Sequence, residues 1–175
     1  MNPTRRAVVA FGSNLAGPLS GPEEQIRVAA AALADRDGVA PVAASAMYAT
    51  APWGVTDQDE FRNSVLVVDT TLSPLELLHL GQSLEQEARR VRERHWGPRT
   101  LDIDLVHIEG EASDTDELRL PHPWAHERAF VLVPWLDADP DAVLSGRPVA
   151  DWLAELGSEA ATEGIRPLPE VEWSP

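Results

Sequence analysis

The sequence predicts an α+β protein in which one sheet is backed by two helices, with further elements near the C-terminus. Three observations support this fold class. The 175 residues suffice for one compact domain with its own core. Hydrophobic residues make up 43% and charged residues 25%, as in ordinary globular proteins. Short apolar runs alternate with segments whose apolar residues recur at helical spacing.

The first half of the chain predicts one helix and three strands. Residues 7–11 form a short apolar run that is typical of a buried strand and ends at Gly12. Pro22 and two acidic residues begin a helix over 22–36, which Gly38 ends. Strands are expected over 39–50 and 61–70, separated by a loop rich in Pro, Gly and Asp.

The second half begins with a capping box at Ser73-Pro74-Leu75-Glu76, which predicts a helix to about residue 91. Residues 100–108 alternate with period two and predict a strand that carries His107 on the same face as Leu105. A hairpin-like stretch over 109–120, a helix within 121–136 and a short helix over 149–156 are expected to follow.

The resulting order β-α-β-β-α-β is that of a ferredoxin-like sandwich with extra C-terminal elements. We expect residues 1–156 to form a single domain. Residues 157–175 contain several prolines and acidic residues, and we expect them to be a loose tail.

Charge and composition exclude several classes of protein. The net charge of −15 disfavours nucleic-acid binding. No apolar run approaches the roughly 18 residues that cross a bilayer, so neither membrane nor nucleic acid is an expected partner. The absence of cysteine excludes disulfides and thiolate metal sites, and we expect a cytoplasmic protein. All 14 basic residues are arginine, which excludes a Walker P-loop and a Schiff-base lysine.

Two clusters of charged residues, one basic and one acidic, lie close together in the sequence near Trp96-Gly97-Pro98. Five arginines lie between Arg89 and Arg99, either as an anion site or as a solvated helix end. Asp102 and Asp104 are two residues apart on one predicted strand, so their carboxylates point to the same face. By itself, an Asp-x-Asp pair is more often two exposed carboxylates on the protein surface. Next to the arginines, the pair instead indicates a site for Mg²⁺ and a nucleoside triphosphate.

Residues 95–106, HWGPRTLDIDLV, resemble the signature of the 6-hydroxymethyl-7,8-dihydropterin pyrophosphokinase family of folate biosynthesis. Further matching blocks follow in family order at 11–15, 48–52, 57–63, 72–74, 121–123 and 127–130. The resemblance implies a ferredoxin-like fold, two Mg²⁺ ions, ATP as diphosphate donor and AMP as product.

The resemblance also implies roles for individual residues. The catalytic set is Asp102, Asp104, Arg90 and Arg99, with Asp102 and Asp104 as the Mg²⁺ ligands. The ATP-binding set is Gln82, Glu85, Arg92, Leu105, His122 and Arg128. The pterin-binding set is Thr50, Ala51, Trp53, Phe61, Asn63, Trp96 and Phe130.

Some of these residues suit the same roles on chemical grounds. Phe61 and Asn63 project from one face of a predicted strand, where an aromatic ring and an amide match a pterin's flat ring and its donor and acceptor edge. Without the other matching sequence blocks, we would interpret Asn63 as a turn-forming residue at the end of a strand and Phe130 as an ordinary residue of the hydrophobic core. Glu85 could also be a surface partner of Arg89.

Two positions depart from the family pattern. Arg89 stands where the family usually has glycine, and His95 where an arginine commonly precedes the aromatic residue. We expect one phosphate contact to be weaker or pH-dependent. Ala16-Gly17 and an extended loop replace the usual Gly-Asp after Leu15, which changes that loop but no ligand that can be named.

The predicted function is transfer of the diphosphate of ATP to 6-hydroxymethyl-7,8-dihydropterin by a monomeric enzyme whose partners are small molecules. One alternative is a Mg²⁺-dependent nucleotidyl- or glycosyltransferase that uses the same aspartate pair. Another is a ferredoxin-like sensor that binds a nucleotide without turnover. His122 and His126, four residues apart, could alternatively form a two-histidine metal site.

Overall fold

The computed structural model describes residues 2–14, 21–51, 60–95, 100–157 and 164–175, with the backbone alone for residues 90–95 and 100. The first seven elements follow the predicted order β-α-β-β-α-β, with the second predicted strand divided in two. They are β1 (Arg5–Asn14), α1 (Pro22–Ala34), β2 (Val39–Ala44), β3 (Met47–Thr50), β4 (Phe61–Thr70), α2 (Pro74–His95) and β5 (Thr100–Ile108).

Smaller elements follow β5. They are β6 (Ser113–Asp114), β7 (Arg119–Leu120), the 3₁₀ helix η1 (Ala125–Glu127), α3 (Ala129–Ala138), β8 (Val143–Leu144), β9 (Arg147–Pro148), α4 (Val149–Leu156) and β10 (Ile165–Leu168). The expected hairpin over 109–120 is present as β6 and β7, and the short helix over 149–156 has the predicted bounds. The hairpin of β8 and β9 was not predicted.

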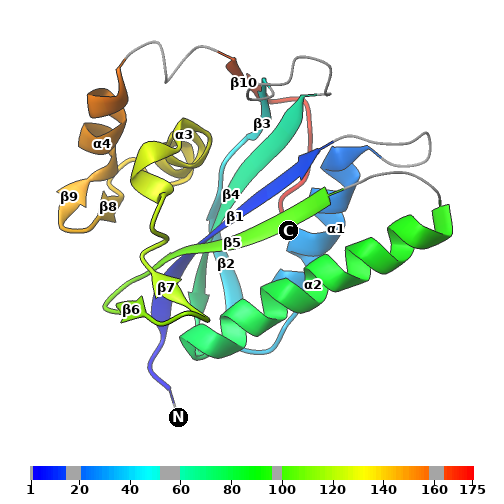
Figure 1. The fold of residues 1–175 in the computed structure, drawn as a ribbon, viewed down its shortest axis with the longest axis horizontal. Coiled ribbons are helices and arrows are strands. Elements are labelled where there is room, and N and C mark those ends of the chain that lie inside the picture. The colour runs from blue at the N-terminus through cyan, green and yellow to red at the C-terminus, as the bar shows by residue number, and fades with distance from the viewer. Residues whose placement is uncertain (1, 15–20, 52–59, 96–99, 158–163) are drawn as a thin grey trace.

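The main sheet has the strand order β10-β3-β4-β1-β5, with β2 also paired to β4, and every pairing is antiparallel. Helices α1 and α2 cover one face, whereas α3 and α4 lie on the other (Figure 1). The predicted α+β sandwich is confirmed. Among the described residues, no helix combines the length and apolar character that crossing a membrane requires.

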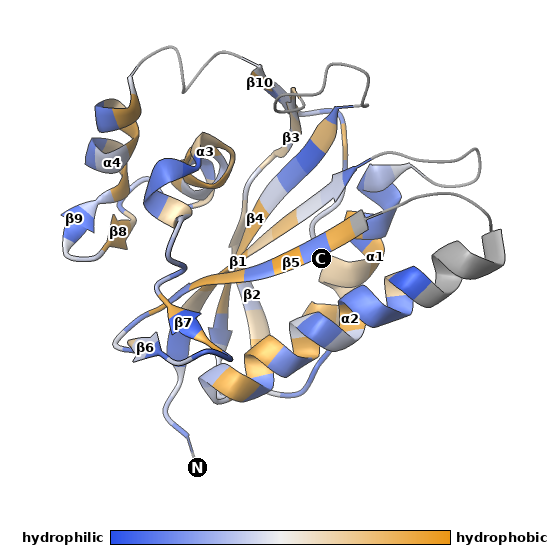
Figure 2. Ribbon diagram, viewed as in Figure 1, coloured by the Kyte–Doolittle hydropathy of each residue, from blue (hydrophilic) through white to orange (hydrophobic). Residues whose placement is uncertain are grey.

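Both faces of the sheet are buried, and β1 is a buried strand, as its short apolar run predicted. Val9 and Phe11 belong to the core beneath α1 and α2, while Val8 and Ala10 belong to the core beneath α3 and α4. β5, at one edge, carries hydrophobic and hydrophilic residues in alternation, and the hydrophobic residues of α2 gather in its first half (Figure 2). The strands therefore lie between two apolar layers, and a polar side chain on these strands is in an otherwise apolar environment.

The alternation in β5 breaks near its end. The register between β1 and β5 shifts between Val8 and Val9, so that β5 holds one residue more than its partner. This bulge turns His107 toward α3, where its ring lies 5.8 Å from that of Trp135. The prediction that His107 shares a face with Leu105 is therefore wrong, because a strict period of two assumes an uninterrupted ladder.

Helix α2 is longer than predicted, since it continues to His95 instead of ending near residue 91. Arginine and glutamate favour helix, and no glycine or proline lies between Val91 and Gly97. The strand expected over 39–50 is interrupted at Ser45, whose hydroxyl accepts a hydrogen bond from the Val65 N–H at 2.9 Å. Helix α3 begins at Ala129 and includes Pro134 within its length.

The expected loose tail is wrong for residues 165–173. Strand β10 pairs with β3 in the main sheet, from Ile165 opposite Thr50 to Leu168 opposite Met47. Trp173 is only 3% exposed, and its indole N–H donates to the Ser45 carbonyl at 2.9 Å. The segment covers what would otherwise be an open sheet edge, so the folded unit extends well beyond residue 156.

Candidate active site

A cavity of about 560 Å³ opens on the α3 face of the main sheet. Strands β1, β3, β4 and β5 contribute to its wall, and η1 and α3 contribute the opposite side. The described lining residues are Ala10, Phe11, Gly12, Thr50, Ala51, Phe61, Asn63, Asp102, Asp104, Trp124, Glu127, Arg128, Phe130 and Val131. Eight of the predicted site residues are among them, and they come from four separate segments.

Gly12 produces the hollow in the sheet surface. It lies opposite Asn63 of β4 and opposite Asp102 of β5. Directly opposed residues in an antiparallel sheet point to the same face, so the side chains of Asn63 and Asp102 flank a position that has none. A Cβ atom on Gly12 would lie 3.0 Å from Asn63 Oδ1, which is tighter than ordinary packing.

Asp102 and Asp104 project into the cavity from β5, as their spacing predicted. Asp102 is open to solvent at the mouth, yet partial removal from water raises the pKa of its carboxyl, and the Asp104 charge raises it further. Arg128 Nη1 lies 3.8 Å from Asp104 Oδ2, and the same guanidinium lies over the Phe130 ring at 5.6 Å. This end of the cavity combines two carboxylates with one cation.

The carboxylate pair fits a hard divalent cation. Burial and the Asp104 charge raise the pKa of Asp102, and a bound Mg²⁺ would stabilise the charged form of this carboxylate. Within the described part of the chain, no group of three His, Cys, Asp or Glu residues could hold a metal. Water and the phosphate oxygens of a substrate could supply further ligands to a cation held by Asp102 and Asp104.

The two-histidine alternative finds no support in the described residues. His122 Nδ1 accepts a hydrogen bond from the Trp124 N–H at 3.2 Å, and burial lowers the pKa of the His122 imidazole. The His126 ring instead lies 5.4 Å from that of Trp152 on α4. The two imidazoles therefore make separate contacts and no shared site.

The end of the cavity formed by β3 and β4 is aromatic and amide in character. Asn63 Nδ2 donates to Thr50 Oγ1 at 2.9 Å, and both residues are buried. Phe61 of β4 and Phe130 of α3 line the same space. This arrangement suits a flat heterocycle with hydrogen-bonding groups on its edge, because aromatic rings offer stacking surfaces and an amide both donates and accepts.

Several predicted residues lie elsewhere. The Leu105 side chain packs in the core on the α2 side of the sheet, away from the cavity. Glu85 accepts a hydrogen bond from the Ile103 N–H at 3.3 Å, and burial raises the pKa of its carboxyl. Gln82 is exposed on α2. Neither Gln82 nor Glu85 is among the described lining residues.

The remaining predicted residues fall where side chains are not described. Arg90 and Arg92 belong to the last turns of α2, for which only the backbone is described. Trp53, Trp96 and Arg99 lie outside the described residues.

Six described lining residues were not among the predicted site residues: Ala10, Phe11, Gly12, Val131, Trp124 and Glu127. Trp124 is 55% exposed at the cavity, and Glu127 lies in η1 beside it. Their place in the sequence was the available signal for Trp124 and Glu127. Trp124 directly follows the matching block 121–123, and Glu127 is the first residue of the block 127–130. A large exposed aromatic side chain at a pocket is a common mark of a binding surface.

Comparison with known proteins gives a family. Residues 8–140 match the family model described as 7,8-dihydro-6-hydroxymethylpterin-pyrophosphokinase (HPPK). The chain belongs to this HPPK family. It is 45% identical over 154 residues to 2-amino-4-hydroxy-6-hydroxymethyldihydropteridine pyrophosphokinase of Methylorubrum extorquens, covering 86% of this chain and 93% of that protein. The resemblance seen in the sequence is confirmed.

Other HPPK relatives agree. The protein of the same name from Pseudomonas aeruginosa is 42% identical over 165 residues, covering 94% of this chain and 98% of that protein. The crystal structure of wild-type HPPK-DHPS from Plasmodium falciparum superimposes with a TM-score of 0.71 at 12% identity. That match covers 95% of this chain and 48% of the other, so it shows a common fold with about half of a longer protein.

Proposed function

We propose that this HPPK protein transfers the diphosphate of ATP to 6-hydroxymethyl-7,8-dihydropterin, giving AMP and the dihydropterin diphosphate in folate biosynthesis. One observation carries the proposal: a single cavity joins the Asp102 and Asp104 carboxylates to the buried Asn63 and Thr50 pair. Relatives at 41–45% identity carry the name of this enzyme.

The aromatic end is the proposed pterin subsite. Asn63 and Thr50, with the backbone at Ala51, would read the hydrogen-bonding edge of the ring, while Phe61 and Phe130 would stack on its faces. From the resemblance, Trp53 and Trp96 are further proposed contacts. A pterin held at this end would present its hydroxymethyl group toward the carboxylate pair.

The carboxylate end is the proposed phosphate subsite. Asp102 and Asp104 would hold two Mg²⁺ ions, which when bound would neutralise phosphate charge and orient the triphosphate. Arg128 supplies a cation beside Asp104. Arg90, Arg92 and Arg99 are proposed phosphate contacts, and Gln82, Glu85, Leu105 and His122 are proposed contacts for the remainder of ATP, with Leu105 acting through its backbone.

The proposed reaction is an in-line displacement at the β-phosphorus of ATP. The primary hydroxyl oxygen of the pterin forms a bond to the β-phosphorus of ATP and gives up its proton to water. The bond from that phosphorus to the oxygen bridging the α- and β-phosphorus breaks, and AMP leaves with the bonding electron pair. Catalysis then rests on holding the two substrates in line and on neutralising the charge that develops. The chain contributes by binding each substrate at a fixed end of one cavity.

An assay with ATP, Mg²⁺ and the reduced pterin alcohol tests the proposal. We expect one AMP for each dihydropterin diphosphate formed. ADP as the sole nucleotide product would overturn it. A nucleotidyltransferase would instead release pyrophosphate, and a sensor would bind nucleotide saturably without forming AMP.

We further propose that the enzyme is a cytoplasmic monomer. The net charge of −15 opposes self-association, and the absence of cysteine suits a reducing compartment. Light scattering at several protein concentrations should give a mass near 19.1 kDa, and cell fractionation should recover the protein with cytosolic markers. A concentration-independent dimer or a membrane fraction would contradict the corresponding half of this proposal.

A further inference from the structure

The C-terminal strand bears directly on one wall of the cavity. Strand β3 lies between β4 and β10, and its end supplies the lining residues Thr50 and Ala51. Ile165 pairs with Thr50, and the Ala51 N–H donates to the Gly164 carbonyl at 2.8 Å. The wall at Thr50 and Ala51 therefore takes part of its backbone support from the C-terminal segment.

Gly164 is packed closely against Ala51. Its φ of +73° lies in the left-handed region that favours glycine. A Cβ atom built on Gly164 would lie 2.9 Å from Ala51 Cβ. Because the Ala51 Cβ is attached directly to the backbone, relief of that contact would move the cavity wall itself.

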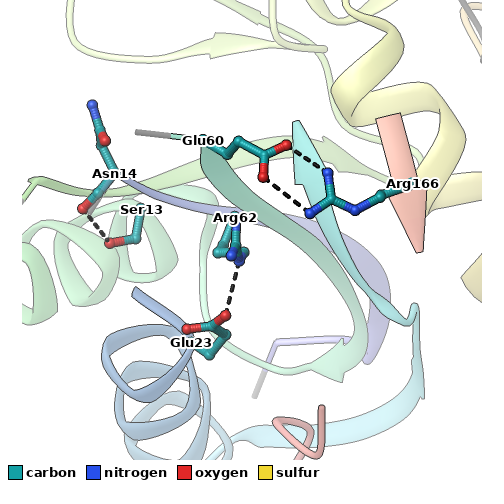
Figure 3. A network of polar contacts seen from close by, with 6 residues as sticks. All are labelled: Ser13, Asn14, Glu23, Glu60, Arg62 and Arg166. Carbon is teal, nitrogen blue, oxygen red and sulfur yellow. Dashed lines mark hydrogen bonds and ion pairs between the residues drawn. The ribbon is translucent and has the colours of Figure 1, made fainter. Parts of the chain in front are cut away.

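Arg166 adds a second link, to the strand that carries Phe61. Its Nη1 and Nη2 atoms lie 2.6 Å and 3.0 Å from the two carboxylate oxygens of Glu60 (Figure 3). Glu60 immediately precedes Phe61, so the ion pair joins β10 to the start of β4 across β3. The neighbouring Arg62 instead pairs with Glu23 of α1 at 2.8 Å.

We propose that Gly164 and Arg166 are positioning residues for the pterin subsite and set the affinity for the pterin without setting that for ATP. The inference rests on the proposed function. The strand order explains the selectivity, because β10 and β5 are opposite edges of the sheet. Asp102 and Asp104 come from β5, and Arg128 comes from the segment between η1 and α3, so neither phosphate-binding group touches the C-terminal strand through the sheet ladder.

The first test compares Gly164→Ala with Gly146→Ala. Gly146 has nearly the same φ, +75°, but nothing lies within 4 Å of a Cβ built there. Both variants therefore introduce the same backbone strain, and Gly164→Ala alone introduces the contact with Ala51. We expect Gly164→Ala to raise the KM for the pterin about 10-fold with the KM for ATP within about two-fold of wild type, and Gly146→Ala to leave both unchanged.

A double variant isolates the contact. Ala51→Gly removes the atom that the new Cβ meets, so Ala51→Gly with Gly164→Ala should recover most of the pterin KM relative to the Ala51→Gly single variant. Equal changes in both KM values for Gly164→Ala, or a pterin KM raised equally by Gly146→Ala, would overturn the role of Gly164.

Arg166 gives an independent test, because its side chain is exposed and we expect its replacement to leave the fold intact. Arg166→Ala should raise the pterin KM about two- to five-fold, with partial recovery in Arg166→Lys. Arg6→Ala is the matched control, since Arg6 pairs with both oxygens of Asp69 at 3.1 and 3.4 Å between β1 and β4. If Gly164→Ala does not fold, the Arg166 result decides. An unchanged pterin KM in Arg166→Ala, or the same rise in Arg6→Ala, would overturn the role of Arg166.

Different results would overturn the proposed function and the positioning role of Gly164 and Arg166. Absence of AMP formation by the wild-type enzyme would overturn the proposed function, and the inference with it. Normal wild-type turnover together with wild-type pterin KM values in Gly164→Ala and Arg166→Ala would overturn the inference alone.

Discussion

Asn63 and Thr50 form a buried hydrogen bond from one strand to the next, with Nδ2 of Asn63 donating to Oγ1 of Thr50 at 2.9 Å. The bond uses one amide hydrogen and fixes the orientation of the amide plane. The Asn63 Oδ1 atom then lies on the side of Gly12, where the sheet surface is hollow. The second amide hydrogen and this oxygen could then bind the edge of a heterocycle.

Replacing Asn63 with Ala should weaken pterin binding by about 1–3 kcal/mol, because buried polar groups of the ligand and of Thr50 lose their partner. Binding of an ATP analogue should change little, since its proposed contacts lie at the Asp102 end. Titration of the variant with each ligand measures both effects. Equal losses for the two ligands would mean that Asn63 supports the fold in general and does not line a pterin subsite.

Replacing Gly12 with Ala should fill the hollow between Asn63 and Asp102. The new Cβ would lie 3.0 Å from Asn63 Oδ1, so we expect at least a 10-fold fall in kcat/KM for the pterin. Alanine in a strand costs less conformational entropy than glycine, so thermal stability should be unchanged or higher. A variant with wild-type kinetics would show that the hollow is not used by substrate.

Replacing Asp102 or Asp104 with Asn should lower turnover about 100-fold or more while the protein stays folded. Each change removes a charged ligand at the proposed Mg²⁺ site and the transition-state stabilisation that it provides. Asp141→Asn, at an exposed acid on the segment before β8, is the control. Wild-type rates in both Asp102→Asn and Asp104→Asn would identify them as ordinary surface carboxylates.

The titration of Tyr48 offers a clean test of the core beneath α3. Burial first, and then the charge and hydrogen bond of Asp137, raise the pKa of Tyr48 to about 12. Tyr48 is the only tyrosine, so absorbance of the phenolate reports it alone. We expect the folded protein to titrate well above 10, and Asp137→Asn to titrate lower. A midpoint near 10 before unfolding would contradict this environment.

The same shift sets a pH dependence of stability. The folded state holds the Tyr48 proton more tightly than the unfolded state, so its contribution is complete below pH 10 and is lost as the pH rises toward 12. The full shift corresponds to about 2–3 kcal/mol. Urea unfolding of Tyr48→Phe should show a flatter alkaline limb than wild type, and parallel limbs would show that other groups control alkaline unfolding.

The C-terminal tryptophan should be a major source of stability. Trp173 is buried against Phe11, with ring centroids 6.0 Å apart. Trp173→Ala should lower the free energy of unfolding by about 3–5 kcal/mol, and Trp173→Phe by less, since it loses mainly the bond to the Ser45 carbonyl. Trp124→Ala, at a 55% exposed position, is the control. A small effect of Trp173→Ala would mean that the tail is only weakly attached.

The helices and strands up to β5, and the common face of Asp102 and Asp104, could be predicted from the sequence. Each depends on local signals: a capping box at Ser73, a proline at Pro22 and a period of two along β5. Such signals act between residues a few positions apart and need no knowledge of the remaining chain. The family signature over residues 95–106 is also local, and it contains Trp96, Arg99, Asp102, Asp104 and Leu105, whereas the other candidate site residues lie outside this stretch.

Only the tertiary structure decided how distant segments meet. Gly12 between Asn63 and Asp102, Ile165 beside Thr50, and Trp173 against Phe11 each join residues far apart in the chain. The bulge that turns His107 toward Trp135 depends on how β5 aligns with β1. Strand register and edge pairing are set by packing over the whole sheet, because any one strand's local pattern is compatible with several partners and registers.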